Sequence, residues 1–407
     1  MRIASAPWWL FALCLYLSVG CTSASRPAVT DADSAAVPRV DTVRPLQVGA
    51  AQFEVYLPQL KGRAVGIVAN HTSLVEGAHL VDLLREKDVN LKRIFTPEHG
   101  FRGNVGDGEH IDSGIDPTTG LPIASLYGAN RKPKPEWLQD LDVVLFDLQD
   151  VGTRFYTYIS TMHYMMAECA RQGKLFIVLD RPNPNGEFVD GPIREEKLKG
   201  FVAMHPIPIL HGLTVGELAQ MINGEGWLGE GLECPLQVIP VANYTHQTPY
   251  EPPVKPSPNL PNYHAIRLYP SLCLFEGTVV SIGRGTPFPF QVAGAPDPAY
   301  GAFTFTPVPM PESSPHPPQE GKKCYGVDYR EVNITGLSLE PLLSFYRNSP
   351  DKATFFNKNN YINTLSGTPT FQEQVKAGKT EAEIRASWEP ALSQYKAMRK
   401  NYLLYAE

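Results

Sequence analysis

The sequence predicts an α/β protein in which helices cover both faces of a parallel sheet, followed by a smaller C-terminal α/β (α+β) domain. Three observations support this fold class. Short β-branched runs alternate with helical patterns from about residue 62 onward. These runs are apolar at consecutive positions, as expected for strands that are buried on both faces. The chain has 407 residues, of which 43% are hydrophobic, and is long enough for two or three domains with substantial cores.

The elements of the first domain, which we expect over residues 46–246, follow from the periodicity of apolar residues. Its predicted strands span residues 64–69, 93–96, 142–147, 175–180 and 236–241. Its predicted helices span residues 79–87, 155–169 and 214–223. In the second of these helices, apolar side chains recur three and four residues apart, which is typical of a helix with one buried face.

Polar side chains gather in the loops that follow four of the predicted strands. These loops are NHTS (70–73), TPEHGFRG (96–103), DLQDVGTRFYTY (147–158) and DRPNPNG (180–186). Ligands of open α/β sheets bind beyond the carboxyl ends of the strands. We therefore expect the four loops to form one rim that carries the functional site.

Proline is unusually frequent, at 38 of 407 residues, against an ordinary frequency of about 5%. We expect a stiff proline-rich connector over residues 247–262 and a C-terminal domain over residues 263–407 that contributes to the cleft. Within that domain, a proline-rich loop over residues 287–318 is expected to be stiff backbone beside the cleft rather than disorder. Residues 324–334 are predicted to hold a strand and residues 337–348 a helix. Thr380 and Glu383 form a capping box that opens a last helix.

The amino terminus has the features of an export signal. Arg2 precedes an apolar run over residues 6–20, which is shorter than the roughly 20 residues that a membrane-spanning helix needs. Residues 18–21 (SVGC) are similar to a bacterial lipobox, although the usual Leu lies one residue too early. We therefore expect a signal peptide over residues 1–20, a lipid on Cys21 and a flexible tether over residues 21–45. The exported protein would be a membrane-anchored lipoprotein facing the periplasm or the cell surface, with plain secretion as the alternative.

The composition and the missing motifs exclude several classes of function. Lys and Arg number 36 against 42 Asp and Glu, and no basic run is present, so we expect no nucleic acid partner. The dinucleotide fingerprint GxGxxG is absent, as are HExxH and paired CxxC motifs, so we expect no cofactor and no metal. The absence of GxSxG weakens a serine hydrolase mechanism. The sequence leaves open the disulfide state of the four cysteines downstream of the tether, which are Cys169, Cys234, Cys273 and Cys324.

Several long motifs, taken in order, resemble those of the NamZ-type exo-β-N-acetylmuramidases. The motifs are TPEHGFRG (96–103), SGIDPTTGLPIASLYG (113–128), DVVLFDLQDVGTRFYTYIST (142–161), VLDRPNPNGEFVDGP (178–192), HGLTVGELA (211–219), PSPNLPN (256–262), LYPSLCLFEGTVVSIGRGTPFPF (268–290) and YLLY (402–405). The resemblance covers the chain from about residue 50 to its end. Ile282 stands where the family often has Glu or Val, and Ser271 stands where it often has Gly, and these departures bear on fine specificity more than on activity.

The resemblance implies a Rossmann-like domain followed by a smaller C-terminal domain. It also implies hydrolysis of terminal, non-reducing N-acetylmuramic acid from peptidoglycan fragments. The glutamate of the TPEHG motif is the family's favoured catalytic acid, and Glu98 occupies that position here. The implied partners are peptidoglycan-derived saccharides that end in muramic acid.

The residues themselves offer candidates for this chemistry. Glycoside cleavage usually needs one protonated carboxyl group and a second carboxylate about 5 to 9.5 Å away. Glu98 lies at a strand end beside apolar residues, where desolvation would raise the pKa of a general acid. An exposed carboxylate or a salt bridge to Arg102 is the alternative for Glu98. The candidates for the second group are Asp147, Asp150 and Glu276, and the amide oxygen of a 2-acetamido sugar is a further nucleophile.

Arginine suits the lactyl carboxylate of muramic acid because its planar guanidinium binds carboxylates in a bidentate manner. Arg154 and Arg284 are the candidates, with an Asp150–Arg154 ion pair and a structural salt bridge of Arg284 as alternatives. If Tyr156 and Tyr158 both lie on the predicted helix, at most one of them faces the cleft. The remaining substrate-binding candidates are His71, His99, Arg102, Asp147, Tyr156, Asn183 and Asn185. The two asparagines lie in Pro-Asn-Pro-Asn-Gly, which is also a simple turn sequence.

Three functions compete at this level. The first is the exo-acting muramidase. The second is a non-catalytic muropeptide or glycan receptor on a lipoprotein tether, which would share the polar rim and the arginines but would not need Glu98. The third is another cell-wall hydrolase, such as an amidase or esterase, which would need a metal or a nucleophilic Ser or Cys. The carboxylates at the strand ends favour the first.

Overall fold

The computed structural model describes residues 45–98, 100–102 and 114–407. The expected signal peptide, Cys21, nearly all of the tether and His99 therefore lie outside the described residues. The described residues belong to one compact unit. Within it, the sheet part comes first in the chain, and the C-terminal part begins with α5 (Tyr263–Leu272).

A mostly parallel sheet forms the first part of the fold, as the sequence predicted, and it has seven strands where five were expected. Its strands are, in spatial order, β5 (Gly114–Ile115), β6 (Pro122–Ser125), β4 (Leu91–Thr96), β1 (Val65–Ala69), β7 (Val143–Asp147), β8 (Leu175–Leu179) and β9 (Leu236–Ile239). All neighbouring strands pair in parallel except β5 and β6, which are antiparallel. The carboxyl ends of the parallel strands consequently lie at one edge of the sheet.

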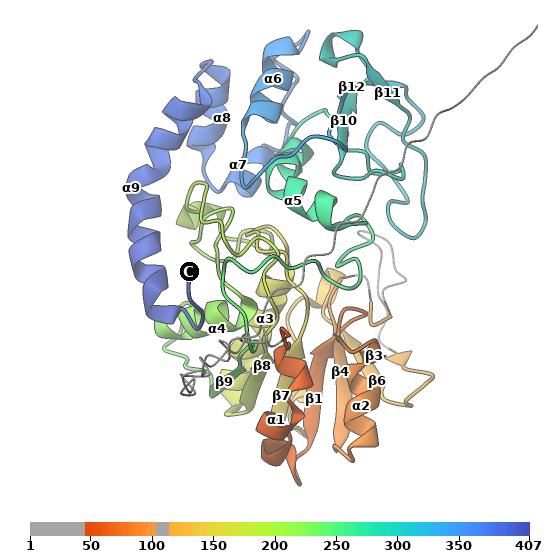
Figure 1. The fold of residues 1–407 in the computed structure, drawn as a ribbon, viewed down its shortest axis with the longest axis vertical. Coiled ribbons are helices and arrows are strands. Elements are labelled where there is room, and N and C mark those ends of the chain that lie inside the picture. Colours follow the sequence, from red (N-terminus) through yellow and green to blue (C-terminus); the bar gives the residue numbers. More distant parts are fainter. Residues whose placement is uncertain (1–44, 99, 103–113) are drawn as a thin grey trace, which may run out of the picture. The chain divides into compact units, whose positions relative to one another are not determined.

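Helices cover both faces of this sheet (Figure 1). On one face, α1 (Phe53–Leu60) and α2 (Leu80–Glu86) share a core with the side chains of Ile67 and Leu145. On the other face, α3 (Tyr158–Gln172) and α4 (Val215–Gly224) share a core with the neighbouring residues Val68 and Val144. Alternate residues of a strand point to opposite faces, so two buried faces require apolar residues at consecutive positions.

The C-terminal part contains a second, smaller sheet with its own helices. Its three antiparallel strands lie in the order β10 (Val292–Ala295), β12 (Cys324–Asp328) and β11 (Phe303–Phe305). The helices after α5 are α6 (Glu340–Asn348), α7 (Tyr361–Ser366), α8 (Pro369–Lys376) and α9 (Glu381–Arg399). The predicted capping box of Thr380 and Glu383 is present at the start of α9. A short hairpin of β2 (Leu74–Val75) and β3 (Ala78–His79) completes the strands named in the described residues.

The C-terminal segment returns to the first sheet. In Figure 1, α9 (blue) runs back toward α4, and the C terminus lies near that helix. Tyr405 donates a hydrogen bond to Asp180, the residue directly after β8, over 2.5 Å, and the backbone N–H of Leu404 donates to Glu217 of α4 over 2.8 Å. The YLLY motif therefore holds the end of the chain against the carboxyl edge of the first sheet.

Arg154 also joins distant parts of the chain, and this corrects our prediction that it binds substrate. Its side chain is completely buried. The guanidinium donates to the carbonyls of Pro192, Ile207 and Leu365 over 2.6 to 2.8 Å. The expected ion pair with Asp150 is absent from the described residues, because these three carbonyls engage the guanidinium instead.

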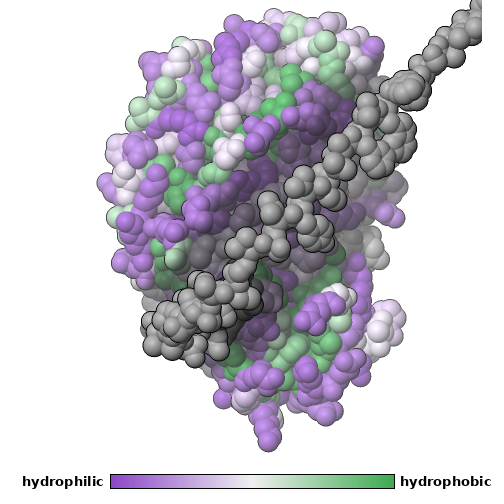
Figure 2. Space-filling view, in the orientation of Figure 1, coloured by the Kyte–Doolittle hydropathy of each residue, from purple (hydrophilic) through white to green (hydrophobic). Residues whose placement is uncertain are grey.

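The cysteines and the surface complete the description of the fold. The four cysteines at 169, 234, 273 and 324 are buried and form no disulfide within the described residues. The face seen in Figure 2 is mainly hydrophilic, with separate small hydrophobic patches. None of the helices in the described ranges is both long and apolar enough to cross a membrane.

Candidate active site

A pocket of about 720 Å³ lies where the carboxyl edge of the first sheet meets the C-terminal part. Glu98 reaches it from the loop after β4, and Tyr156 and Tyr158 reach it from the segment after β7. Glu276 and Arg284 line it from the C-terminal part. Two of the four polar loops expected at the sheet edge therefore contribute to the pocket, together with the predicted second-domain segment.

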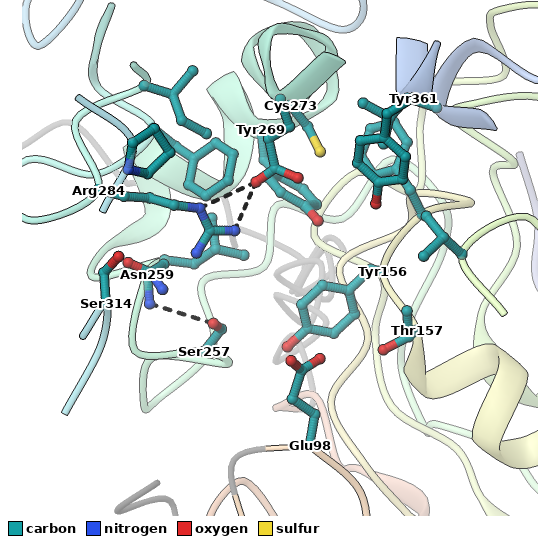
Figure 3. Close-up of a pocket in the computed structure, with 18 of the residues that line it drawn as sticks. Glu98, Tyr156, Thr157, Ser257, Asn259, Tyr269, Cys273, Arg284, Ser314 and Tyr361 are labelled. Carbon is teal, nitrogen blue, oxygen red and sulfur yellow. Dashed lines mark hydrogen bonds and ion pairs between the residues drawn. The ribbon is translucent and has the colours of Figure 1, made fainter. Parts of the chain in front are cut away.

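Glu98 points into the pocket toward the hydroxyl of Tyr156 (Figure 3). The Tyr156 hydroxyl donates to the carbonyl of Pro256 over 2.8 Å, and the Tyr158 hydroxyl accepts from the side chain of Asn70 over 2.8 Å. Burial raises the pKa of both tyrosines, and the charge of Glu98 raises the pKa of Tyr158 further. Both phenols therefore stay protonated at neutral pH and present neutral hydroxyl groups beside the carboxylate.

The expectation that only one of the two tyrosines faces the cleft is wrong. Both line the pocket. The helix α3 begins at Tyr158, so Tyr156 lies in the preceding turn and is not held to helical spacing. Their rings meet edge to face with centroids 4.8 Å apart.

Arg284 and Glu276 form an ion pair on another wall of the pocket. Glu276 belongs to the 3-10 helix η5 (Cys273–Gly277), and its Oε1 accepts from Nη2 of Arg284 over 2.7 Å and from Nε over 3.1 Å. The Arg284 guanidinium also lies over the ring of Phe290, 5.1 Å from the centroid. The two side chains keep 15% and 23% of their surface exposed, so the pair is open to the pocket. The salt bridge and the access to ligand, which the sequence posed as alternatives for Arg284, occur together.

Glycines on both sides of Arg284 determine the course of its loop. Gly283 and Gly285 have φ values of +79° and +77°, a region that side-chain-bearing residues rarely adopt. A Cβ at Gly285 would also lie 2.6 Å from Pro317 and from the carbonyl of Val308. The Gly-Arg-Gly sequence thus lets this loop pack closely under the proline-rich segment while it presents the arginine.

Both proline-rich segments contribute walls to the pocket. Ser257 and Asn259 of the connector line it, as do Ser314 and His316 of the long proline-rich loop. The Asn259 side chain donates to the carbonyl of Ser313 over 2.7 Å, which ties the two segments together. The interpretation of this proline as stiff backbone beside the cleft fits the position of both segments.

Four predicted binding residues are used inside the protein instead. Asp147 and Arg181 form a fully buried ion pair with oxygen–nitrogen distances of 2.6 and 2.9 Å. Asn183 donates to the carbonyl of Leu213 and accepts from the backbone N–H of Asn185, which itself donates to Val151. The two asparagines therefore stabilise a buried turn, and Asp147 is part of a buried ion pair. Our assignments of Asp147, Asn183 and Asn185 to substrate binding are corrected for this reason, as that of Arg154 was above.

The remaining candidates also lie outside the set of described residues that line the pocket. Asp150 is buried behind it, where its Oδ2 accepts from the backbone N–H of Gly152 over 2.6 Å. Arg102 forms an ion pair with Asp116 over 3.0 Å. Asp116 therefore competes with Glu98 for Arg102, the partner that the sequence offered as an alternative for Glu98. The His71 ring contacts the carbonyl of Lys255 over 2.8 Å.

Sequence reasoning missed several residues that line the pocket. They include Thr157, Asn259, His316, Tyr361, Arg131 and Phe201. Asn259 lies in the PSPNLPN motif, and Thr157 lies between Tyr156 and Tyr158. Both residues therefore belong to motifs that the sequence analysis had already singled out, and they could have been found there. His316 lies in the long proline-rich loop and Tyr361 begins α7. Together with Arg131 and Phe201, they come to line one pocket only through the fold. No group of three or more His, Cys, Asp and Glu side chains that could hold a metal occurs among residues 45–98, 100–102 and 114–407.

The fold and the site together define a class of protein. The chain is an α/β protein with a polar pocket at the carboxyl edge of its sheet. Within the described residues, the pocket holds two carboxylates, one of them paired with an arginine, and several tyrosines, among them the neutral Tyr156 and Tyr158. Pairs of carboxyl groups in such pockets are typical of glycoside hydrolases.

Comparison with known proteins identifies the family. Residues 65–264 match the family model of the N-terminal part of the exo-beta-N-acetylmuramidase NamZ, and residues 267–405 match that of its C-terminal part. The chain therefore belongs to the NamZ family. A relative from Bacillus subtilis (strain 168), the peptidoglycan beta-N-acetylmuramidase NamZ, is 37% identical over 384 residues, which cover 86% of this chain and 89% of the relative.

Two crystal structures from Bacteroides fragilis NCTC 9343 share the fold. Both are of DUF1343 family proteins. The first is 44% identical with a TM-score of 0.82 and covers 89% of this chain and all of its own. The second is 29% identical with a TM-score of 0.76 and covers 88% of this chain and 99% of its own.

Proposed function

We propose that the protein is an exo-acting glycoside hydrolase that releases terminal, non-reducing N-acetylmuramic acid from peptidoglycan fragments during cell-wall turnover. The strongest support for the proposal is the position of two side chains in the pocket. Glu98, the carboxylate of the TPEHG motif, points into a pocket that also presents Arg284. The substrate has a glycosidic oxygen that needs a proton and a lactyl carboxylate that needs a cation, and the pocket offers a group for each.

Glu98 is the proposed general acid. It is partly buried, and the hydroxyl groups of two tyrosines that remain neutral lie beside it. A carboxyl group in such surroundings can hold a proton and donate it to the leaving oxygen as the bond breaks.

Arg284 is the proposed ligand of the lactyl carboxylate, and Glu276 is the proposed second carboxylate. Nε and Nη2 of Arg284 both donate to Oε1 of Glu276, which fixes the guanidinium in place. Substrate carboxylate would share the guanidinium with Glu276. The acetamido oxygen of the sugar is the alternative nucleophile, and kinetics of the Glu276→Gln variant distinguish the two, as developed below.

The protein is also proposed to be exported and anchored by a lipid on Cys21. The apolar run over residues 6–20 and the SVGC sequence support this. Growth of expressing cells with a labelled fatty acid should label the wild type, and Cys21→Ala should remove the label and release the protein from the membrane fraction. Labelling of the variant would contradict the anchor.

The activity is tested with the purified protein, the disaccharide of N-acetylmuramic acid and N-acetylglucosamine, and a chromogenic muramide. Wild type should release free N-acetylmuramic acid, and Glu98→Gln should be slower by at least a hundredfold. Glu136→Gln, which removes an exposed carboxylate from the 3-10 helix η3 (Pro135–Trp137), is the matched control and should be unaffected. No release by the wild type, with binding retained, would favour a receptor instead. Release that persists in Glu98→Gln would refute the assigned acid.

A further inference from the structure

Two cations and two aromatic rings form a cluster that the proposed function does not yet use. The cluster, here called the cation platform, consists of Arg131, Lys132, Tyr164 and Phe201. The rings of Tyr164 and Phe201 stack with an interplanar angle of 13° and centroids 6.2 Å apart. The Arg131 guanidinium lies 4.7 Å from the Phe201 centroid, and Nζ of Lys132 lies 5.2 Å from the Tyr164 centroid.

The charges of the platform are not neutralised by carboxylates. In the part of the chain that the structure describes, no carboxylate lies within salt-bridge distance of Arg131 or Lys132, and both side chains are exposed. Contact with aromatic faces restricts both side chains, so their charges are held in place without being cancelled.

Two members of the platform, Arg131 and Phe201, line the same pocket as Glu98. Arg284, also in the pocket, keeps only 15% of its side-chain surface exposed, whereas Arg131 is an exposed residue. An enzyme that removes terminal sugars must enclose the terminal sugar of the saccharide and leave the remaining sugars exposed to solvent. This difference in exposure assigns the enclosed wall with Arg284 to the terminal sugar and the open side with Arg131 to the rest of the substrate.

We propose that the cation platform binds a carboxylate of the second muramic acid, on the far side of the bond that is cleaved. This proposal rests on the proposed function. In peptidoglycan, N-acetylmuramic acid alternates with N-acetylglucosamine, so the leaving group starts with a neutral sugar and its next sugar is acidic. The carboxylate is the lactyl group when that sugar is free of peptide, and it belongs to the stem peptide when one is attached. In both cases the enzyme prefers fragments that contain a second, acidic muramic acid residue over the disaccharide, which lacks it.

The test compares substrates with and without the second muramic acid. The substrates are the disaccharide, the peptide-free tetrasaccharide and a tetrasaccharide whose second muramic acid carries a stem peptide. The measured quantity is the ratio of kcat/KM for each tetrasaccharide to that for the disaccharide. Arg131→Gln should lower this ratio about tenfold, the effect of one charge-assisted contact at a partly exposed site. The substrate on which the ratio falls identifies which carboxylate is bound.

Lys134→Gln is the matched control. Lys134 lies in the same loop and over an aromatic ring, 5.2 Å from the centroid of Trp137, but it does not line the pocket. Its removal should leave the ratio and both rates unchanged. An unchanged ratio in Arg131→Gln, or an equal fall in Lys134→Gln, would overturn the platform.

Binding separates this proposal from the proposed function. In calorimetry with Glu98→Gln protein, adding Arg131→Gln should weaken tetrasaccharide binding about tenfold more than disaccharide binding. If the wild type cleaves no substrate but shows this difference, the proposed function is refuted and the platform stands. If cleavage occurs and the affinity difference is absent, the platform is refuted and the proposed function stands.

Discussion

Replacement of Tyr405 by phenylalanine tests how the C-terminal segment holds the sheet edge. The Tyr405 hydroxyl donates to Oδ2 of Asp180 over 2.5 Å and accepts from the backbone N–H of Val241 over 2.8 Å. Phenylalanine keeps the ring, which packs edge to face on Tyr244 with centroids 4.9 Å apart. The variant therefore removes two hydrogen bonds and little else.

The expected loss of stability is about 2–4 kcal/mol. A hydrogen bond to a charged group contributes about 1.5–3 kcal/mol, and the buried N–H of Val241 would be left without its acceptor at a cost of about 1–3 kcal/mol. Asp180 keeps the hydrogen bond from the Thr214 hydroxyl and those from the backbone N–H groups of Gly216 and Arg181. The loss should therefore remain below the sum of the two upper limits.

The loss should also depend on pH. Burial raises the pKa of Asp180 to about 7, and the hydrogen bond from Tyr405 opposes this rise. Without the hydroxyl, the pKa of Asp180 in the folded protein rises further above its ordinary value. A raised carboxyl pKa costs stability only where the group must ionise, so the added cost is present above about pH 7 and disappears as the pH falls below it. The destabilisation should be larger at pH 8 than at pH 6.

Urea unfolding at both pH values measures the effect, with Tyr402→Phe as the control. Tyr402 lies in the same segment and donates to Glu225 over 2.7 Å. Because Glu225 is exposed and solvent weakens such contacts, this hydroxyl should contribute less than about 1 kcal/mol. Equal losses in the two variants would refute the reasoning, as would a Tyr405→Phe loss that is greater at pH 6 than at pH 8.

Three further predictions concern acid stability, the active site and the last helix. Burial lowers the pKa of His163 to about 4 and that of His205 well below its ordinary value, so only the unfolded chain takes up protons near pH 6.5 and stability is lost as the pH falls below that value. The free energy of unfolding of the wild type should fall by about 2 kcal/mol between pH 7 and 5.5 because of these two histidines. In the variant with both histidines replaced by glutamine, the midpoint of urea unfolding should depend much less on pH. In steady-state kinetics, Glu276→Gln should lower kcat at least a hundredfold, and an effect on KM alone would reassign Glu276 to holding Arg284. Thr380→Ala should destabilise α9 by about 1 kcal/mol, seen as faster hydrogen exchange in its first turn, and unchanged exchange there would contradict the role of the cap.

The sequence predicted the elements of the first sheet closely where the pattern was strong. The run over residues 64–69 became β1 (Val65–Ala69), the helix expected over residues 214–223 became α4 (Val215–Gly224), and the predicted capping box of Thr380 opens α9. These elements were predictable because burial of both faces and helix capping leave local marks in the chain. The strands β5 and β6 were missed, because one has two residues and the other begins at a proline.

The site was predicted less completely, because side chains of the same chemistry ended in different surroundings. Glu98 and Asp147 both lie at the ends of parallel strands. Glu98 enters the pocket, whereas Asp147 is enclosed with Arg181. No local pattern distinguishes the two, since the partner of Asp147 comes from the next strand along the sheet.

The sequence by itself determined the fold class and the motifs, and through them it made Glu98 the candidate acid, since each depends on periodicity or on residues adjacent in the chain. The tertiary structure alone decided which of the two candidate arginines is accessible to a ligand. Arg284 reaches the pocket on a loop between two glycines. The guanidinium of Arg154, in contrast, is buried and donates hydrogen bonds to three backbone carbonyls from distant segments. A guanidinium is available to substrate only where the fold leaves it accessible, and that accessibility is set by segments that meet only when the chain is folded.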